Sequence, residues 1–529
     1  MVLLHRKEKD IIKRRIDGYL KGYRHNIALL GKPRVGKSTL LSDLLMKNFS
    51  DTNLLPVHIN LFYVDSSNFA RVSIHSILFN FLKLKNASSC TTIKLDELIF
   101  SIQQLAPATA EAVKECLVSS SSQRNPVKKV FSVIDSLISE AGVKPLIIID
   151  NFCNFKKFPK RQLSDMTQLI LTRNDCMFLF MSSNRLQADE ILNNEFNLLF
   201  GKFEKIYVDS FSEEEAGEFI KNRTAGRLNA VCRDFLLELS GRNPYYLDIF
   251  CRELLRTKHD QEMAEDMFIN IAAHQLSNHE SLIFQTCHRM IEDLKINCKN
   301  DSLCQVLLLI AQGYTRRKEL ASFLKLEPSK VTSRLAVLLD RNIITRKGSF
   351  YTIEDKLFGT WLALVYRVLS SGSFLFQQDF SFCIENMMIE KFRDFKSTVI
   401  KTSFDRFIDL MSCFNDDTVS LKNKSLRLPH IQKYRVVPAS SEGMKFIIAE
   451  AKQTYILMAF KENCVCESDV IEFSNRCSYF KSKQLKKIFV SMERLDQNVK
   501  LLAKEKKLTC WNKNDLNSLL NLYCQPELV

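Results

Sequence analysis

Apolar and polar positions in the first two hundred residues alternate between short apolar runs and longer stretches with a helical period. The apolar runs lie at 27–30, 55–61, 146–149 and 177–181. Residues 1–25 and Val72–Leu84 are stretches in which apolar residues recur at helical spacing. Buried strands that alternate with helices are typical of a parallel sheet covered on both faces. The pattern predicts an α/β domain over residues 1–210.

The first apolar run leads directly into Gly31-Lys32-Pro33-Arg34-Val35-Gly36-Lys37-Ser38-Thr39, and an apolar-periodic helix follows. This is G-x-x-x-x-G-K-[ST], a phosphate-binding loop, with strand, loop and helix in the required order. Backbone N–H groups of such a loop surround phosphate oxygens at the positive end of the helix. Lys37 then reaches the β and γ phosphates, and Ser38 supplies a hydroxyl for Mg²⁺. We expect an ATP and Mg²⁺ site formed by Gly31, Arg34, Val35, Gly36, Lys37, Ser38 and Thr39.

Two later strand ends supply the remaining candidates for this site. Asp150 ends the apolar run 145–149 and is the Walker B candidate, an acid that holds Mg²⁺ through water. The other interpretation of Asp150 is a carboxylate that caps the following loop. Asn151 comes next, and an amide orients water but cannot accept its proton, so binding is better supported than fast hydrolysis. Asn184, or Ser183 before it, is the candidate sensor of the γ phosphate.

Helical patterns dominate from about residue 211, which predicts a helical lid over residues 211–296. Several segments in these two regions accompany the phosphate loop. They are His5-Arg6-Lys7-Glu8, Tyr63-Val64-Asp65, Ile149-Asp150, Leu199-Phe200-Gly201-Lys202 and Gly241-Arg242-Asn243-Pro244-Tyr245-Tyr246-Leu247. Together with the loop, these segments resemble the archaeal-type ATPase family, a STAND and origin-recognition branch of the AAA-like ATPases.

The resemblance implies that Pro244 of the lid lies against the adenine. The chain departs from the family pattern at two positions. Asn151 replaces the usual glutamate, and Lys202 stands where relatives usually have arginine. Both departures favour nucleotide binding over hydrolysis. Many relatives complete the site with an arginine from a neighbouring subunit, and Arg173 and Arg185 are the positional candidates here.

Residues 297–370 follow another pattern, which predicts a winged helix and a connector. Three short apolar-periodic helices, about 306–310, 317–324 and 328–341, precede extended segments at 343–346 and 350–353. Three helices and a hairpin are typical of this DNA-binding module, whose third helix enters the major groove. The expected contacts on that helix are Ser329, Lys330, Thr332, Ser333 and Arg334, with Arg346 and Lys347 of the wing on phosphate. The same pattern also serves as a protein-docking module. It resembles the winged helix that follows the ATPase core in the family.

Residues 371–529 resemble the restriction-endonuclease-like domain fused to many members of the same family. The predicted hairpin comprises 444–450 and 455–461, followed by a helix at 468–482 and a strand at 487–491. Where the family carries an aspartate and then Glu-x-Lys, this chain has Phe446, Ala459 and Lys461, so no metal site is expected. Glu450-Ala451-Lys452 reads as Glu-x-Lys but lies on the wrong strand. We therefore expect an inactive domain kept for binding or assembly.

Composition and charge limit the possible partners. A chain of 529 residues is too long for one core, and its formal net charge of +15 makes a polyanion a natural partner. Its 16 cysteines show no metal-binding spacing, which is typical of reduced thiols in a cytoplasmic protein. No signal-peptide core or membrane span is recognisable, so no membrane partner is expected.

These observations predict an ATP-binding P-loop ATPase that acts as a nucleotide-dependent switch on double-stranded DNA, with homo-oligomers possible. DNA binding would use the winged helix and the basic C-terminal half. The alternative is a STAND-type module that binds a protein and no DNA. An active nuclease would require metal ligands that the aligned positions do not provide.

Overall fold

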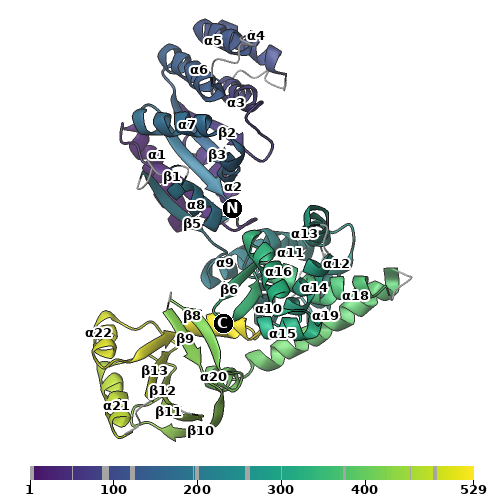
Figure 1. Cartoon of the computed structure of the whole chain (residues 1–529), viewed down its shortest axis with the longest axis vertical. Coiled ribbons are helices and arrows are strands. Elements are labelled where there is room, and N and C mark those ends of the chain that lie inside the picture. Colours follow the sequence, from purple (N-terminus) through teal and green to yellow (C-terminus); the bar gives the residue numbers. More distant parts are fainter. Residues whose placement is uncertain are drawn as a thin grey trace. The chain divides into compact units, whose positions relative to one another are not determined.

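The computed structural model describes residues 5–50, 52–85, 94–118, 125–194, 196, 202–256, 263–298, 301–372, 377–422, 424–452, 454–480 and 485–528. The chain separates into two compact units (Figure 1). The first contains residues 1–215 together with 243–245, and the second contains 216–242 and 246–529. The finer division into four domains remains a prediction. Of the segments named above, Leu199–Gly201 lies outside the described residues.

The first unit is built on a five-stranded sheet with the order β2-β3-β4-β1-β5. Its strands are β1 Asn26–Gly31, β2 Leu54–Asn60, β3 Lys144–Asp150, β4 Met177–Ser182 and β5 Phe203–Val208. Every neighbouring pair is parallel, so all carboxyl ends lie at one edge of the sheet. The predicted α/β class is confirmed.

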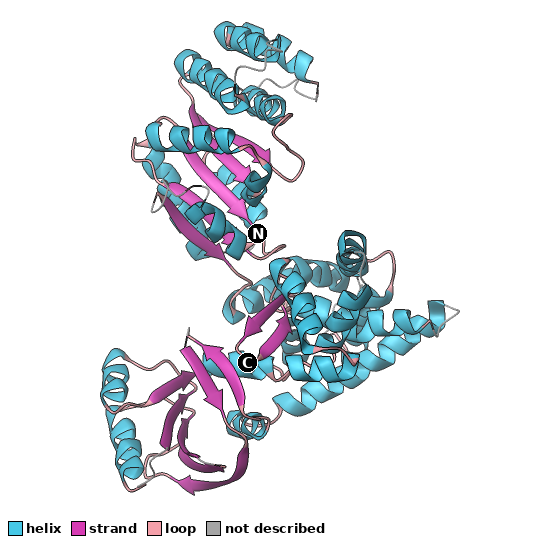
Figure 2. Cartoon of the chain, in the orientation of Figure 1, coloured by secondary structure: helices cyan, strands magenta, loops and turns pink. Residues whose placement is uncertain are grey.

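Helices cover both faces of this sheet (Figure 2). The helices of the unit are α1 Arg6–Leu20, α2 Lys37–Asn48, α3 Phe69–Leu84, α4 Leu95–Leu105, α5 Pro107–Val118, α6 Pro126–Ala141, α7 Lys160–Thr172 and α8 Arg185–Asn194, with a 3₁₀ turn at Phe152–Lys157. Of these, α4 and α5 pack on α3 and α6. Alternate strand residues enter two cores: Ile148 and Leu179 pack with α1 and α2, whereas Ile149 and Phe180 pack with the helices of the other face. This double burial explains why these strands are almost uniformly apolar.

Helices make up the first part of the second unit. They are α9 Glu213–Thr224, which begins in the first unit, α10 Ala230–Ser240, α11 Pro244–Arg256, α12 Glu265–Ser277 and α13 Leu282–Cys298. Buried hydrogen bonds tie them to the next segment: the Trp361 indole donates to the Leu276 carbonyl at 3.2 Å, and Tyr246 donates to Asp355 at 2.5 Å. These helices therefore pack against the segment that follows the next module.

That module has the element order that the sequence predicts. It consists of α14 Asp301–Ala311, α15 Arg317–Leu324, α16 Pro328–Asp340, β6 Ile344–Lys347 and β7 Phe350–Ile353, with the two strands antiparallel. We call it the helix–hairpin module. The short helices α17 Lys356–Trp361 and α18 Arg367–Ser371 follow, joined by a π-helical turn, and then the long α19 Gln377–Val399. Phe392 of α19 packs edge-on against Phe235 of α10.

The C-terminal part holds a second sheet, in the order β10-β11-β12-β13-β14. Its elements are α20 Ser403–Ser412, β8 Asp417–Leu421, β9 Lys424–Leu428, β10 Ile431–Pro438, β11 Met444–Ala451, β12 Thr454–Lys461, α21 Glu467–Ser478, β13 Leu485–Ser491, α22 Gln497–Glu505, β14 Thr509–Asn512 and α23 Lys513–Leu522. The predicted hairpin corresponds to β11 and β12. The sequence analysis did not anticipate β8, β9 and β10.

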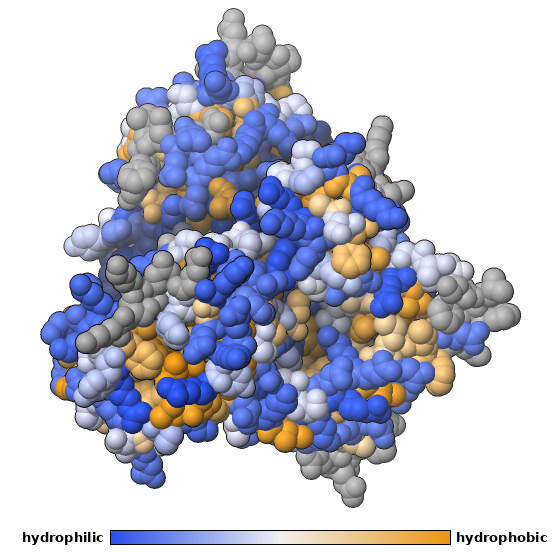
Figure 3. Space-filling view, turned by 60° about the horizontal axis from the view of Figure 1, so that its bottom comes forward, coloured by the Kyte–Doolittle hydropathy of each residue, from blue (hydrophilic) through white to orange (hydrophobic). Residues whose placement is uncertain are grey.

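Hydrophilic side chains cover most of the face shown in Figure 3, and the hydrophobic ones form separate patches. None of the helices in the described part of the chain is both long and apolar enough to cross a membrane.

Candidate functional site

The phosphate-binding loop lies at the carboxyl edge of the first sheet, between β1 and α2. Glycine is required at its two ends for different reasons. A Cβ on Gly31 would lie 2.1 Å from the Val208 carbonyl oxygen of β5, so only glycine fits between these strands. Gly36 has φ +91°, a left-handed conformation that glycine adopts without steric cost and that turns the chain into α2.

Lys37, the first residue of α2, directs its ammonium group back over the loop. Its Nζ donates to the carbonyl oxygens of Gly31 and Lys32, both at 2.8 Å, and to Ser183 Oγ at 3.1 Å. Burial lowers the pKa of Lys37 to about 8, while nearby Asp150 favours the charged form and Arg185 opposes it. A buried cation held by neutral oxygens is strongly attracted to an anion, which is what phosphate would supply. The donor set therefore fits a nucleotide phosphate.

The sheet order brings the other candidates to this lysine. Because β4 lies between β1 and β3, its end is flanked by the loop on one side and by Asp150 on the other. Ser183 contacts Lys37 directly, whereas the side chain of Asn184 accepts a hydrogen bond from the Gln187 backbone at 2.9 Å. Asn184 thus caps α8, as asparagine commonly does, and Ser183 is the polar group at the phosphate side. Of the two sensor candidates, the geometry favours Ser183.

Asp150 and Asn151 share a tight turn after β3. Asn151 has φ +53°, and its Nδ2 donates to Asn60 Oδ1 at 2.9 Å. The Asn151 backbone donates to Asp150 Oδ1 at 2.8 Å, and Asp150 Oδ2 lies 4.0 Å from His58 Nε2. One carboxylate oxygen is therefore held by the turn. Asp150 could hold Mg²⁺ together with Ser38, whose side chain is exposed at the start of α2.

The sequence analysis did not assign His5 or Arg185 to this site. His5 is buried, and its Nε2 donates to the Val35 carbonyl at 2.7 Å, so the segment before α1 supports the loop. Arg185 forms an ion pair with Asp209 and stacks over Tyr207, but its Nε is buried without a partner among the described residues. Arg173 instead pairs with two aspartates of its own unit, Asp135 and Asp175, which makes it a structural residue.

The start of α11 also reaches the loop, because residues 243–245 group with the first unit. The Pro244 Cγ lies 4.0 Å from the position that a Gly36 Cβ would occupy. The Arg34 guanidinium lies 5.9 Å from the centre of the Tyr245 ring. Pro244 therefore lies beside the loop, and its contact with the adenine stays a prediction.

The DNA-contact candidates lie on α16 and on β6. Val331 and Leu335 are buried, which leaves Ser329, Lys330, Thr332 and Ser333 exposed and Arg334 half-buried. Arg346 and Lys347 of β6 are also exposed, and Arg346 donates to the Gly348 carbonyl at 3.0 Å. The candidates therefore lie on one helix and one hairpin of the same module.

The turn of this hairpin contacts β8 of the C-terminal part. The Ser349 backbone donates to the Thr418 carbonyl at 2.8 Å, and Arg316 forms a fork with Asp417 at 2.6 and 2.9 Å. Tyr523 donates to the same carboxylate at 2.8 Å. Partly buried, charge-assisted hydrogen bonds of Asp417 therefore join the helix–hairpin module to the C-terminal part.

The three positions that the sequence analysis compared with a nuclease pattern lie in the core of the C-terminal part. Phe446 pairs with Ala459 in the β11–β12 register, and both are buried. Lys461 forms a 2.6 Å ion pair with Asp469 of α21, and their side chains are only 9% and 2% exposed. No group of three acidic, histidine or cysteine ligands is placed to hold a metal among the described residues.

Sheet, loop and strand-end residues together define a P-loop fold. Chains of solved structures similar to this one include the Aeropyrum pernix ORC2 protein in ADPNP–ADP complexes, with 12% identity, 73% of this chain and 94% of that chain covered, and a TM-score of 0.43. Cdc6p from Pyrobaculum aerophilum matches with 13% identity, 70% and 95% coverage, and a TM-score of 0.36. The Aeropyrum pernix ORC1 protein in complex with DNA matches with 12% identity, 70% and 95% coverage, and a TM-score of 0.34. No model of a known protein family and no curated protein matches the chain. Identities and scores this low say nothing about what the chain binds.

Proposed function

We propose that this protein is an ATP-binding P-loop ATPase that works as a nucleotide-dependent switch on double-stranded DNA. The observation that carries the proposal is the convergence of Lys37, Ser183 and Asp150 at one sheet edge. A desolvated lysine, a hydroxyl and a carboxylate there suit the γ phosphate and its Mg²⁺. Mg²⁺ would neutralise phosphate charge, held by Ser38 and by Asp150 through water.

Lys37 would neutralise the β and γ phosphates, and Ser183 would report the γ phosphate to β4. Asn151 would orient a water, but its amide cannot take the water's proton. Slow hydrolysis suits a switch, because the ATP-bound state then persists. Pro244, beside the loop and at the start of α11, would pass the nucleotide state to the lid helices.

The DNA contact would be the exposed face of α16. We interpret α16 as the third helix of a winged helix. Lys330 and Arg334 would meet base edges or phosphates, and Arg346 and Lys347 would meet phosphates beside the groove. The basic C-terminal half would add to this electrostatic attraction, consistent with the net charge of +15.

The test separates the two binding events. Lys37→Ala should abolish ATP binding measured by calorimetry and leave nucleotide-free DNA binding unchanged. Lys330→Ala should weaken duplex binding and reduce the slope of log K against log salt by about one, with ATP binding unchanged. Lys500→Ala, an exposed lysine of α22, is the control for a general loss of charge.

Unchanged duplex affinity in Lys330→Ala and Arg334→Ala would refute the DNA contact. ATP binding that persists in Lys37→Ala would refute the nucleotide site. Binding to a protein partner that is insensitive to salt, with no duplex binding, would instead support the STAND-type alternative.

A further inference from the structure

A small apolar cavity of about 340 Å³ lies in the C-terminal part, between the sheet and the end of α21. The strand register places Arg435 of β10, Ile448 of β11 and Leu457 of β12 in one row across the sheet, so their side chains share a face. Val437 and Phe446 lie in the next row on this face. Both rows line the cavity, on the side of the sheet that packs against α21.

Part of this apolar lining is open to water. The rings of Phe446 and Phe473 are buried and stacked, with their centres 5.8 Å apart. Val437, Ile448 and Phe480 are only half-buried, so they leave apolar surface exposed in a concave site. Such a site favours a ligand with an apolar body, and the phenylalanines favour an aromatic ring. The volume is at the lower end of the range of ligand pockets, which limits the ligand to a small molecule.

The described residues that line the cavity include two arginines and no acid. Arg435 is exposed and has no ion-pair partner in the described part of the chain. The Arg476 guanidinium lies 4.2 Å from the centre of the Phe446 ring, and this stacking fixes its position. Glu472 Oε1 lies 3.6 Å from Arg476 Nη2, which is longer than a hydrogen bond.

Glu472 does not line the cavity, and its carboxylate is engaged by the turn after β10. It accepts hydrogen bonds from the backbones of Ser440 and Ser441 at 2.9 and 3.3 Å, and from Ser441 Oγ at 2.9 Å. Even if Glu472 is counted against Arg476, the charge of Arg435 is left over. The mouth of the cavity therefore keeps an excess of positive charge.

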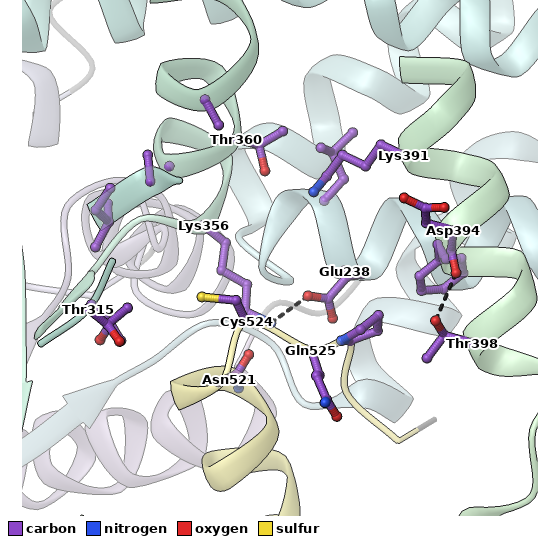
Figure 4. A pocket seen from close by; sticks show the side chains of 18 of the residues that line it. Glu238, Thr315, Lys356, Thr360, Lys391, Asp394, Thr398, Asn521, Cys524 and Gln525 are labelled. Atoms are coloured by element: carbon purple, nitrogen blue, oxygen red, sulfur yellow. Dashed lines mark hydrogen bonds and ion pairs between the residues drawn. The ribbon is translucent and has the colours of Figure 1, made fainter. Parts of the chain in front are cut away.

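The surrounding charges do not remove this excess. In the adjoining row of the sheet, Lys433 lies opposite Glu450, so these two offset each other. A larger cavity of about 710 Å³ in the second unit differs, because its wall carries both signs of charge. There Lys356 donates to Glu238 at 3.0 Å (Figure 4), so charge does not select a ligand in that cavity.

We infer that the cavity between the C-terminal sheet and α21 binds a small aromatic monocarboxylate. Its ring would lie on Ile448 and Phe480, and its carboxylate would accept hydrogen bonds from Arg476 and Arg435. A guanidinium offers two parallel N–H donors that match a carboxylate, and the stacking on Phe446 holds the group of Arg476 in place for this contact. The ligand would join β10 to α21, and its binding does not depend on the nucleotide site.

Isothermal titration calorimetry of the full-length protein with 2-naphthoate at pH 7 tests the inference. The neutral isostere 2-naphthamide should bind about tenfold more weakly, because it brings no charge to the arginines. Octanoate should also bind more weakly than 2-naphthoate, because its flexible chain loses rotational freedom on binding. Saturating ATP should leave the affinity for 2-naphthoate unchanged.

Two variants locate the binding. Arg435→Met should weaken the affinity for 2-naphthoate about fivefold, as expected for an exposed charge contact. Lys433→Met is the matched control, because Lys433 is an exposed cation of the same strand that does not line the cavity. Ile448→Trp should abolish binding, because the larger side chain fills the cavity. Thermal unfolding without ligand checks that each variant folds.

Five results would overturn the inference. They are no binding of 2-naphthoate at millimolar concentration, equal affinity for 2-naphthamide or octanoate, competition by ATP, equal losses in Arg435→Met and Lys433→Met, and unchanged affinity in a folded Ile448→Trp variant.

Discussion

The buried pair Lys461–Asp469 allows a structural role of Lys461 to be tested against a catalytic one. The two side chains lie 2.6 Å apart and are almost completely buried. Asp469 Oδ2 also accepts a hydrogen bond from the Cys466 backbone at 2.8 Å, at the start of α21. Lys461→Met removes the cation and leaves the carboxylate buried. Removal of one partner from a buried pair costs about 3–5 kcal/mol.

The pH dependence of this loss follows from Asp469. Burial by itself would raise the pKa of Asp469, but the hydrogen bonds from Lys461 and Cys466 outweigh it and hold the pKa below its usual range. The stabilisation is therefore fully present above the unfolded-state pKa of about 4 and is lost as the pH falls through the lower folded-state value. The deficit of Lys461→Met should be largest near neutral pH and should shrink in acid.

Urea unfolding at pH 7 and at pH 3 measures the deficit, with tryptophans replaced by 5-fluorotryptophan. The chain has two tryptophans, and fluorine NMR follows them separately; Trp511 lies in the core of the C-terminal sheet. Lys500→Met is the control for loss of an exposed lysine. The double variant Lys461→Met/Asp469→Asn should cost less than the sum of the two single changes. A deficit below about 1 kcal/mol, the range of exposed ion pairs, or one independent of pH, would refute the structural role.

Three further predictions concern the nucleotide site and the docked hairpin. ATP affinity should fall as pH rises above about 8, by at most about tenfold per pH unit, because phosphate binds the charged form of Lys37; calorimetry that shows constant affinity up to pH 9 would contradict this. Asn151→Glu should raise ATP turnover by up to about 10²-fold, because a glutamate can act as general base. The left-handed backbone at this position should make the variant less stable by about 1 kcal/mol. An equal rate of phosphate release in Asn151→Gln would show that the glutamate does not act as a base. Gly348→Ala should destabilise the second unit in urea unfolding by about 2 kcal/mol more than Gly443→Ala. Both glycines have φ +72°, but only a Cβ on Gly348 would lie 2.1 Å from the Thr418 carbonyl oxygen. Equal losses of stability would mean that the hairpin does not dock on Thr418.

Local sequence signals predicted β1 to β4 and the helices α1, α2 and α3 of the first unit, because each signal acts over a few residues. They did not name β5 or the helices α4 to α8. The phosphate loop needs a strand, glycines and a helix start within one short segment, and all of them appear at Gly31–Lys37. The helix–hairpin module was predicted for the same reason, since Pro328 starts its third helix and Gly348 permits its turn. The exposed strand β10 was missed, because its four apolar residues, Ile431, Tyr434, Val436 and Val437, do not alternate regularly with polar ones.

The sequence alone predicted a phosphate-binding loop and an α/β core, and the five-stranded parallel sheet confirms the α/β core. Only the tertiary structure decided which strand-end residue faces the loop lysine. The sequence does not distinguish Asn184 from Ser183, because both are polar residues at a strand end. In the structure, the Asn184 side chain caps α8 by accepting a hydrogen bond from the Gln187 backbone. The tertiary structure also decided that Lys461 is neutralised by Asp469. Partners brought together by long-range packing leave no local pattern, because neither residue's own neighbours in the chain reveal the contact.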